Sequence, residues 1–173
     1  MNYKKWIFLV AIAVVIINCE QKENRYKRSS SEIDQVTSAI AAYEQGNWEA
    51  WVTHFSDTAQ IYENNWHNGM SPERAKNEHI SATGYLAEYG FVREEMVMEQ
   101  IIDDEGRTWV NFWGLWKGTF KVTNRTIEVP VHMTLQFIDG KVVKQYGFWD
   151  LTMFNNEIQK IERVRSENVN DSD

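Results

Sequence analysis

The sequence predicts an α+β domain in which N-terminal helices pack on a strongly curved, mainly antiparallel sheet. Apolar residues recur at helical spacing up to about residue 88, and from residue 91 onward they alternate as they do in strands. Helices followed by consecutive strands favour helices on one face of an antiparallel sheet. Gly114 and Gly118 stand among large aromatic residues, which suits a sharply bent sheet and therefore a cup.

The chain begins with the pattern of an export signal. Lys4 and Lys5 precede an apolar run over residues 6–17, which is 12 residues long, whereas a spanning helix needs roughly 20. The run ends at Asn18 and Cys19, and residues 16–19 resemble the lipobox of bacterial lipoproteins, whose cysteine carries the lipid. We expect a signal peptide over 1–18 and a membrane anchor through lipid on Cys19; the alternative is an uncleaved signal anchor.

The residues after the cysteine set the expected localisation. Residues 19–31 are polar, charged and rich in serine, so they predict a solvated tether. Residues 19–23 resemble the charged signals that send some lipoproteins to the cell surface. We therefore expect a lipid-anchored protein of the bacterial cell envelope, either facing the periplasm or exposed on the cell surface.

Composition limits the class of protein. Cys19 is the only cysteine, so no disulfide is expected and the fold depends on its hydrophobic core. Loss of residues 1–18 removes Lys4 and Lys5 and no acid, which changes the net charge from −7 to −9. An acidic domain without a basic stripe argues against nucleic acid as a partner. The remaining length suits one domain over 32–165, followed by a polar tail over 166–173.

The first half of the domain predicts three helices and one strand. Ile33, Val36 and Ile40 have helical spacing within 32–45, and a short apolar face follows over 48–55. Residues 58–63 predict a strand. Ser71 is a typical helix cap before Pro72, so a third helix is expected over 71–88.

The second half predicts a meander of long strands, followed by a short helix over 155–165. The strands are expected over 91–103, 108–122, 126–138 and 141–153. Asp139 and Gly140 stand between two strand patterns and suit a two-residue type I′ hairpin.

This hairpin places Asp150 on a face of the sheet. If Ile138 opposes Lys141, then Asp150 opposes Val129 and shares the apolar face with Phe148. If residues 124 and 125 form the preceding turn, Phe112 and Trp116 join the same face, an assignment that a one-residue bulge would reverse. A carboxylate on an apolar face has a raised pKa, which suits acid/base chemistry. The alternatives are that a buried hydroxyl of Tyr146 or Thr152 satisfies it, that it caps a neighbouring loop, or that it lies solvated at the rim.

Three short stretches resemble the nuclear transport factor 2-like superfamily and, within it, the SnoaL-like polyketide cyclases. They are residues 43–48 with 55–59, residues 137–142, and residues 147–151. The resemblance implies a cone-shaped domain whose sheet and helices enclose an apolar pocket. It also implies a late-strand aspartate acting as acid and base, a position that Asp150 matches.

Candidate site residues follow from the expected inner face and from the resemblance. Asp150 is the candidate catalytic group, and the candidate ligand-binding residues are Tyr62, Phe112, Trp116, Met133, Tyr146 and Phe148. His132 falls on the other face, and the roles of His54 and His79 stay open. The four histidines show no metal-ligand spacing, so neither a metal nor a cofactor is expected.

Three functions remain open at this point. The first is a non-catalytic cup for a small apolar or aromatic molecule, with Asp150 as its polar anchor. The second is an isomerase, cyclase or dehydratase in which Asp150 moves a proton. The third is an interaction module, because the expected outer face carries Trp109, Trp113 and Trp149 and favours a homodimer.

Overall fold

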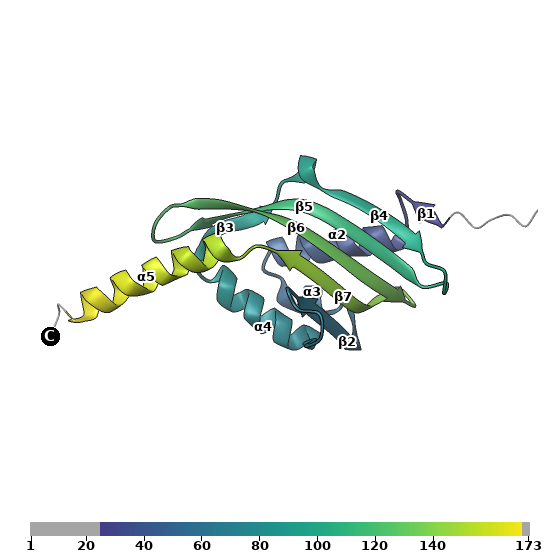
Figure 1. Ribbon diagram of the computed structural model, residues 1–173, viewed down its shortest axis with the longest axis horizontal. Helices are drawn as coiled ribbons and strands as arrows, with labels where there is room; N and C mark the ends of the chain where they lie inside the picture. Colours follow the sequence, from purple (N-terminus) through teal and green to yellow (C-terminus); the bar gives the residue numbers. More distant parts are fainter. Residues whose placement is uncertain (1–24, 171–173) are drawn as a thin grey trace, which may run out of the picture.

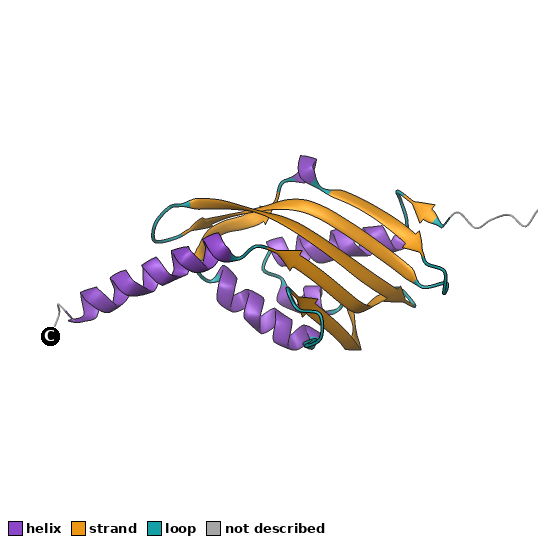
Figure 2. Ribbon diagram, in the orientation of Figure 1, coloured by secondary structure: helices purple, strands orange, loops and turns teal. Residues whose placement is uncertain are grey.

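A computed structural model of the chain describes residues 25–170, so the expected signal peptide and Cys19 lie outside the described residues. The described part is α+β, with helices packed on a curved, mostly antiparallel sheet, as expected (Figure 1, Figure 2). The seven-stranded sheet has the order β1-β4-β5-β6-β7-β2, and β3 pairs with β5 beside β4. Only the β2–β7 pair is parallel among the strand pairs of the described chain.

The helices form where the caps predict them. Helix α2 spans Ser31–Glu44 and is capped by the side chain of Ser30, and α3 spans Trp48–Val52 after the cap Asn47. Helix α4 spans Pro72–Thr83, where Ser71 Oγ accepts a hydrogen bond from the Arg74 amide. It ends before the expected residue 88, because the chain turns at Gly84 and continues as a strand.

The strand expected over 91–103 is two strands. Strand β3 spans Leu86–Phe91 and β4 spans Val97–Ile102, with a 3-10 turn over Arg93–Glu95 between them. Both pair with β5, Thr108–Phe120, so the turn allows two shorter strands to pair with one long strand. The remaining strands are β2 at Phe55–Glu63, β6 at Thr126–Ile138 and β7 at Lys141–Trp149.

The β6–β7 hairpin has the expected turn but a different register beyond it. Asp139 and Gly140 have φ angles of 50° and 73°, as a type I′ turn requires. Phe137 pairs with Val142, and Gln136 then pairs with Lys144, so Val143 is an extra residue in β7. This bulge reverses the faces of the rest of β7, because side chains alternate with a period of two.

The β5–β6 pair differs from expectation without changing faces. Trp116 pairs with Val129 and Phe112 with Met133, four residues from the register that a turn at 124–125 implies. A shift of four is even, so Phe112 and Trp116 lie on the inner face as predicted. The inner face and the helices enclose two clusters of buried apolar side chains, one centred on α2 and one beneath the start of α5.

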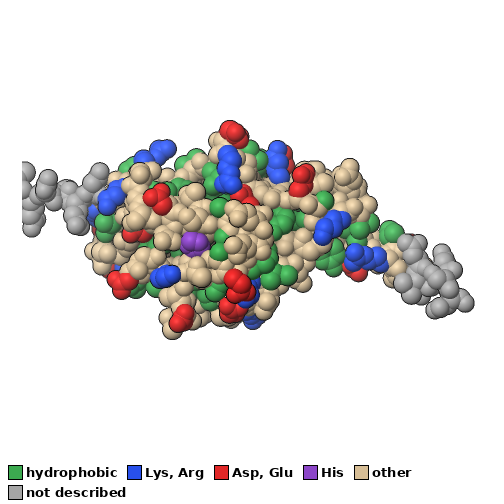
Figure 3. Space-filling view, turned by 180° about the vertical axis from the view of Figure 1, so that it is seen from behind, with side chains coloured by type: hydrophobic (Ala, Val, Ile, Leu, Met, Phe, Trp, Pro, Cys, Tyr) green, Lys and Arg blue, Asp and Glu red, His purple; other side chains and the backbone are tan. Residues whose placement is uncertain are grey.

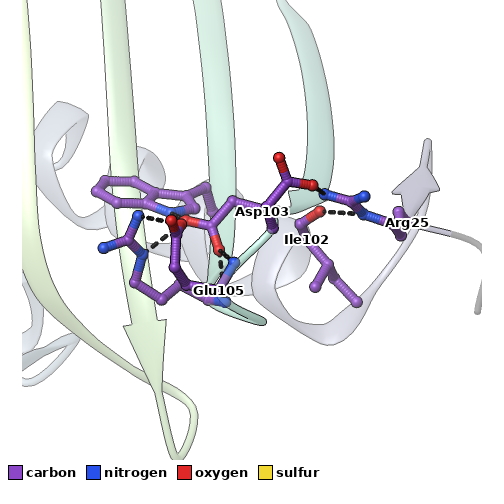
Figure 4. Close-up of polar contacts among 7 residues, drawn as sticks. Arg25, Ile102, Asp103 and Glu105 are labelled. Carbon is purple, nitrogen blue, oxygen red and sulfur yellow. Dashed lines mark hydrogen bonds and ion pairs between the residues drawn. The ribbon is translucent and has the colours of Figure 1, made fainter.

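The N-terminal end of the described chain is attached to the edge of the sheet. Strand β1, Tyr26–Lys27, pairs with β4, although the sequence placed these residues in the tether. Arg25 donates to the carbonyl of Ile102 at 2.8 Å and forms an ion pair with Asp104 (Figure 4). Asp103 beside them accepts from Arg107 and from the Trp109 indole, which fixes the β4–β5 turn.

Helix α5, Thr152–Asn170, is longer than the expected 155–165 and extends away from the sheet, at the opposite end of the molecule from β1 (Figure 1). Its first turns are held by Phe154 and Ile161, which are buried, and by Glu157, which pairs with Arg125. On the side opposite to the view of Figure 1, acidic and basic side chains are interspersed, so that side carries no single-sign field (Figure 3).

Candidate functional site

A cavity of about 160 Å³ lies between the inner face of the sheet and the helices. Helices α2, α3 and α4 form one wall and strands β5, β6 and β7 form the other, and Leu151 and Phe154 also contribute to the lining. Most of the lining is apolar. The cavity therefore has the general character of a small-molecule site, in which an apolar wall carries a few placed polar groups.

Some of the polar groups in the lining come together at Glu63 and His79. Glu63 ends β2 and His79 lies in α4, and their Oε1 and Nε2 atoms are 3.0 Å apart. The side chains are 14% and 20% exposed, respectively. Although the distance is that of an ion pair, Oε1 of Glu63 lacks a partner with hydrogen-bond geometry in the described chain. This carboxylate oxygen is thus fully buried, with the His79 imidazole as its neighbour.

Aromatic rings surround the imidazole of His79. Trp48 stacks on it at 6.2 Å between ring centroids, and Tyr43 and Trp51 meet it edge-on at 5.6 Å each. These rings leave the imidazole little rotational freedom. They therefore fix His79 beside Glu63, as a positioned acid/base group requires.

Tyr43 contributes a hydroxyl to the same wall. Its oxygen accepts a hydrogen bond from the Trp116 indole at 3.1 Å, so the hydroxyl proton points elsewhere. Burial is the main cause that raises the pKa of Tyr43 far above its ordinary value. Tyr43 is therefore a neutral hydrogen-bond donor over the whole physiological pH range.

Gln145 is a further polar residue in the lining. It is 5% exposed and lies on the inner face of β7, next to Ile61 of β2. Glu63 is on the same face of β2, opposite Gly147. A side chain at Gly147 would overlap the ring of Trp149, which lies over it and lines the cavity. Glycine at this position therefore leaves room for both the ring and the cavity.

Asp150 lies outside the cavity, in contrast to the expected position on the apolar face. It follows the last residue of β7, is exposed, and accepts a hydrogen bond from the Thr152 amide at 2.8 Å. Hydrogen bonds from Thr152 lower the pKa of Asp150, so the expected increase was wrong. The physical reason is the bulge at Val143, which reverses the faces of β7 and leaves Asp150 at the start of α5.

The other predicted site residues divide between the two faces. Trp116 and Met133 line the cavity, and Phe112 is fully buried behind it against Phe91. Tyr146 and Phe148 face outward because of the bulge, and Tyr62 stacks on Tyr146 at 4.7 Å. The structure thus brings part of the predicted ligand-binding set together and removes the rest from the cavity.

The contacts of each histidine show whether its side chain faces the cavity. His132 stacks on Trp113 on the outer face, as expected, and His79 lines the cavity. His54 Nδ1 lies 2.7 Å from Gln35 Oε1, and partial burial lowers the pKa of His54. Among the described residues, no group of three or more His, Cys, Asp or Glu could hold a metal ion, and no helix is long and apolar enough to span a membrane.

Sequence reasoning missed Glu63 and Gln145. A signal for Glu63 was present, because Ala59, Ile61 and Glu63 alternate along the predicted strand and share its buried face. Gln145 had no such signal. Its inward direction depends on the bulge at Val143.

No family model matches the sequence, and no curated protein matches it. Solved structures do. One is a candidate polyketide cyclase from Xanthomonas campestris pv. campestris, with 14% identity, a TM-score of 0.58, and coverage of 74% of this chain and 96% of that chain. Another is IdmH, a candidate polyketide cyclase from Streptomyces antibioticus, with 14% identity, a TM-score of 0.62, and coverage of 75% and 99%.

The fold is that of the SnoaL-like, nuclear transport factor 2-like proteins. A protein of ketosteroid isomerase-like fold from Catenulispora acidiphila, solved with trimethylamine, also matches, with 14% identity, a TM-score of 0.55, and coverage of 69% of this chain and 87% of that chain. At such identity, the likeness establishes the SnoaL-like fold and leaves the activity to the residues of this chain.

Proposed function

We propose that this SnoaL-like domain binds a small, mainly apolar molecule in its inner cavity. The observation that carries the proposal is the apolar cavity of about 160 Å³ between sheet and helices. An engineered apolar cavity of about 150 Å³ takes up benzene, so the space suits a molecule with a single ring. Ligands with several fused rings would require the wall at Leu151 and Phe154 to move.

A titration of the full-length protein with benzene tests this proposal. Ala82 lines the cavity from α4, so Ala82→Phe fills part of the space. Ala87 in β3 is exposed and does not line the cavity, which makes Ala87→Phe the matched control. Benzene should bind the wild type and Ala87→Phe and should not bind Ala82→Phe. Failure of the wild type to bind would contradict the proposal.

Acid/base catalysis in the same cavity is the second candidate function. It is supported by the juxtaposition of Glu63, His79 and Tyr43, and not by Asp150. Glu63 can remove a proton from a carbon next to a carbonyl, and the contact with His79 orients the Glu63 carboxylate for this step. Tyr43 can donate a hydrogen bond to the developing enolate oxygen. Return of the proton by Glu63 to the γ-carbon of a dienolate, formed from a β,γ-unsaturated ketone, would complete an isomerisation.

Cyclohexanone in D₂O tests this candidate without a known substrate. Removal of an α-proton by Glu63 and return of a deuteron would exchange that position, which NMR detects. We expect Glu63→Gln to abolish the exchange and Asp150→Asn to leave it unchanged, because Asp150 lies outside the cavity. Benzene binding without cyclohexanone exchange would favour binding alone.

We further propose that the protein is lipid-anchored through Cys19 in the bacterial cell envelope. The described chain begins at Arg25, which is attached to the β4 edge at the end opposite to α5 (Figure 1). A lipid on Cys19 would bring this end nearest the membrane and direct α5 away from it. Incorporation of a labelled fatty acid in the wild type, and its loss in Cys19→Ala, would support the anchor; no incorporation in the wild type would exclude it.

A homodimer through the outer sheet face is the remaining proposal. Val97, Trp113, His132 and Phe148 are paired in one row across β4, β5, β6 and β7. Trp113, Phe148 and Val97 are exposed, and Trp66 stacks on the neighbouring Tyr146. A contiguous exposed apolar row favours an interface.

A further inference from the structure

Gln145 has a buried side chain whose polar atoms face the cavity. Its neighbours across the sheet are Leu135 of β6 and Ile61 of β2, both apolar and both buried. Within the part of the chain that the structure describes, the Gln145 amide makes no side-chain hydrogen bond, and its atoms are not among those fully buried without a partner, so they keep accessible surface. The amide differs in this from Gln35, whose oxygen is held by His54.

An amide offers two donor hydrogens and an acceptor oxygen, and in Gln145 these are left for a group outside the protein. A group inside the cavity would supply the missing partner. Trp149 and Val142, on the same inner face of β7, offer only apolar surface or ring edges there. Gln145 is therefore the position on this strand where a ligand can form hydrogen bonds.

The charges of the lining restrict the ligand further. No lysine or arginine lines the cavity within the described residues, and Glu63 contributes a carboxylate. A ligand with its own carboxylate would enter an apolar space without a counterion. The polar group that meets Gln145 should therefore carry no negative charge, whereas a cation would be drawn to Glu63 instead of Gln145.

We propose that Gln145 recognises a neutral, single-ring ligand by a hydrogen bond to its hydroxyl or carbonyl oxygen. This inference rests on the proposed function, because it assumes that the cavity takes up an apolar ring. It adds a chemical class: phenols, cyclic alcohols and cyclic ketones are preferred over the corresponding hydrocarbons and carboxylates.

Calorimetric titration of the full-length protein with phenol, benzene and benzoate tests the inference, with a protein-free blank for each probe. Phenol should bind about 3- to 10-fold more tightly than benzene, the range of one net hydrogen bond. Benzoate should not bind. In Gln145→Met the order should reverse, because the hydroxyl then enters the cavity without its partner.

Gln100→Met is the matched control. Gln100 is 3% exposed, and its Oε1 also lacks a partner in the described chain, but it lies in β4 and does not line the cavity. This control should keep the preference for phenol. If Gln145→Met does not fold, the side-chain amide resonance of Gln145 in the wild type replaces it, and should shift further with phenol than with benzene, whose ring current alone acts on it.

The outcomes separate the inference from the proposed function. Equal affinities for phenol and benzene, or a phenol preference that survives in Gln145→Met, would overturn the role of Gln145 while the cavity remains a binding site. An unshifted amide resonance at saturating phenol would do the same. If none of the probes binds the wild type, the proposed function itself fails.

Discussion

Nε2 of His79 lies 3.0 Å from Oε1 of Glu63 inside a box formed by the rings of Tyr43, Trp48 and Trp51. The carboxylate lies at the end of β2 and the imidazole comes from α4, so the contact joins the sheet to the helix across the cavity. It joins two largely buried polar side chains that both line the cavity.

Loss of the His79 imidazole should destabilise the folded protein. His79→Ala should lower the free energy of unfolding by about 2–3 kcal/mol, because it empties the aromatic box and leaves the Glu63 carboxylate without its neighbour. Urea denaturation measures this change. His67→Ala, in an exposed loop, is the control and should change stability by no more than about 0.5 kcal/mol.

A double-mutant cycle tests whether Glu63 and His79 interact. Because the two side chains are in contact, Glu63→Gln combined with His79→Ala should cost at least about 0.5 kcal/mol less than the sum of the single changes. Strict additivity would show that the two side chains do not interact in solution.

Asp150 should act on α5 and not in the cavity. Its carboxylate accepts from the Thr152 amide at the positive end of the helix, so Asp150→Ala should weaken the start of α5 and lower the melting temperature slightly. Asp150→Asn keeps an acceptor oxygen and should melt close to the wild type. A loss of benzene binding in Asp150→Asn, with the melting temperature retained, would return Asp150 to the cavity.

The case of Asp150 shows how far the sequence could predict this molecule. Helix caps such as Ser71, the Asp139-Gly140 turn and the inner face of β5 follow from local chemistry, and the structure confirms them. The bulge at Val143 does not follow, because residues 141–149 alternate acceptably in either register. One extra residue in β7 moved Asp150 out of the predicted site and brought Gln145 in.

The contact between Glu63 and His79 could not be predicted from the sequence, for a different reason. Each residue stands on a predicted element, although sequence reasoning did not assign Glu63 to a buried face. Their contact depends on how α4 packs against β2, which is tertiary structure. Patterns with periods of two and 3.6 locate faces, but they do not determine which faces meet.

Acid should destabilise the attachment of α5 through Glu157. Hydrogen bonds from Thr123, and then from Arg125 and Lys160, hold the pKa of Glu157 below its ordinary value of 4.5. The unfolded chain therefore binds the proton more readily, so the stabilisation is complete above about pH 5 and is lost as the pH falls through the folded-state pKa. Glu157→Gln should flatten the decrease in stability below about pH 5.

Chemical denaturation at a series of pH values measures this effect. Glu167→Gln on the exposed part of α5 serves as the control and should keep the wild-type pH profile. A Glu157→Gln profile that runs parallel to the wild type would show that the buried carboxylate is not the group that titrates.

The oligomeric state should depend on the row across the outer face of the sheet, which consists of Val97, Trp113, His132 and Phe148. Trp113 is 40% exposed and lies at the centre of the row, so Trp113→Glu should convert a dimer to a monomer. Light scattering after size-exclusion chromatography measures the mass. Val122→Glu, in the exposed β5–β6 turn, should leave the dimer intact. A wild type that is monomeric at every concentration would reject the homodimer.

A crystal structure of the full-length protein grown with benzene tests the central claim most directly, namely that the cavity is a binding site for a ring-sized apolar molecule. The account predicts density for one ring between the helices and the sheet, beside Val131, Met133 and Trp149, and an empty site in Ala82→Phe. Density at the outer face only, or side chains that fill the cavity in the presence of saturating benzene, would contradict it.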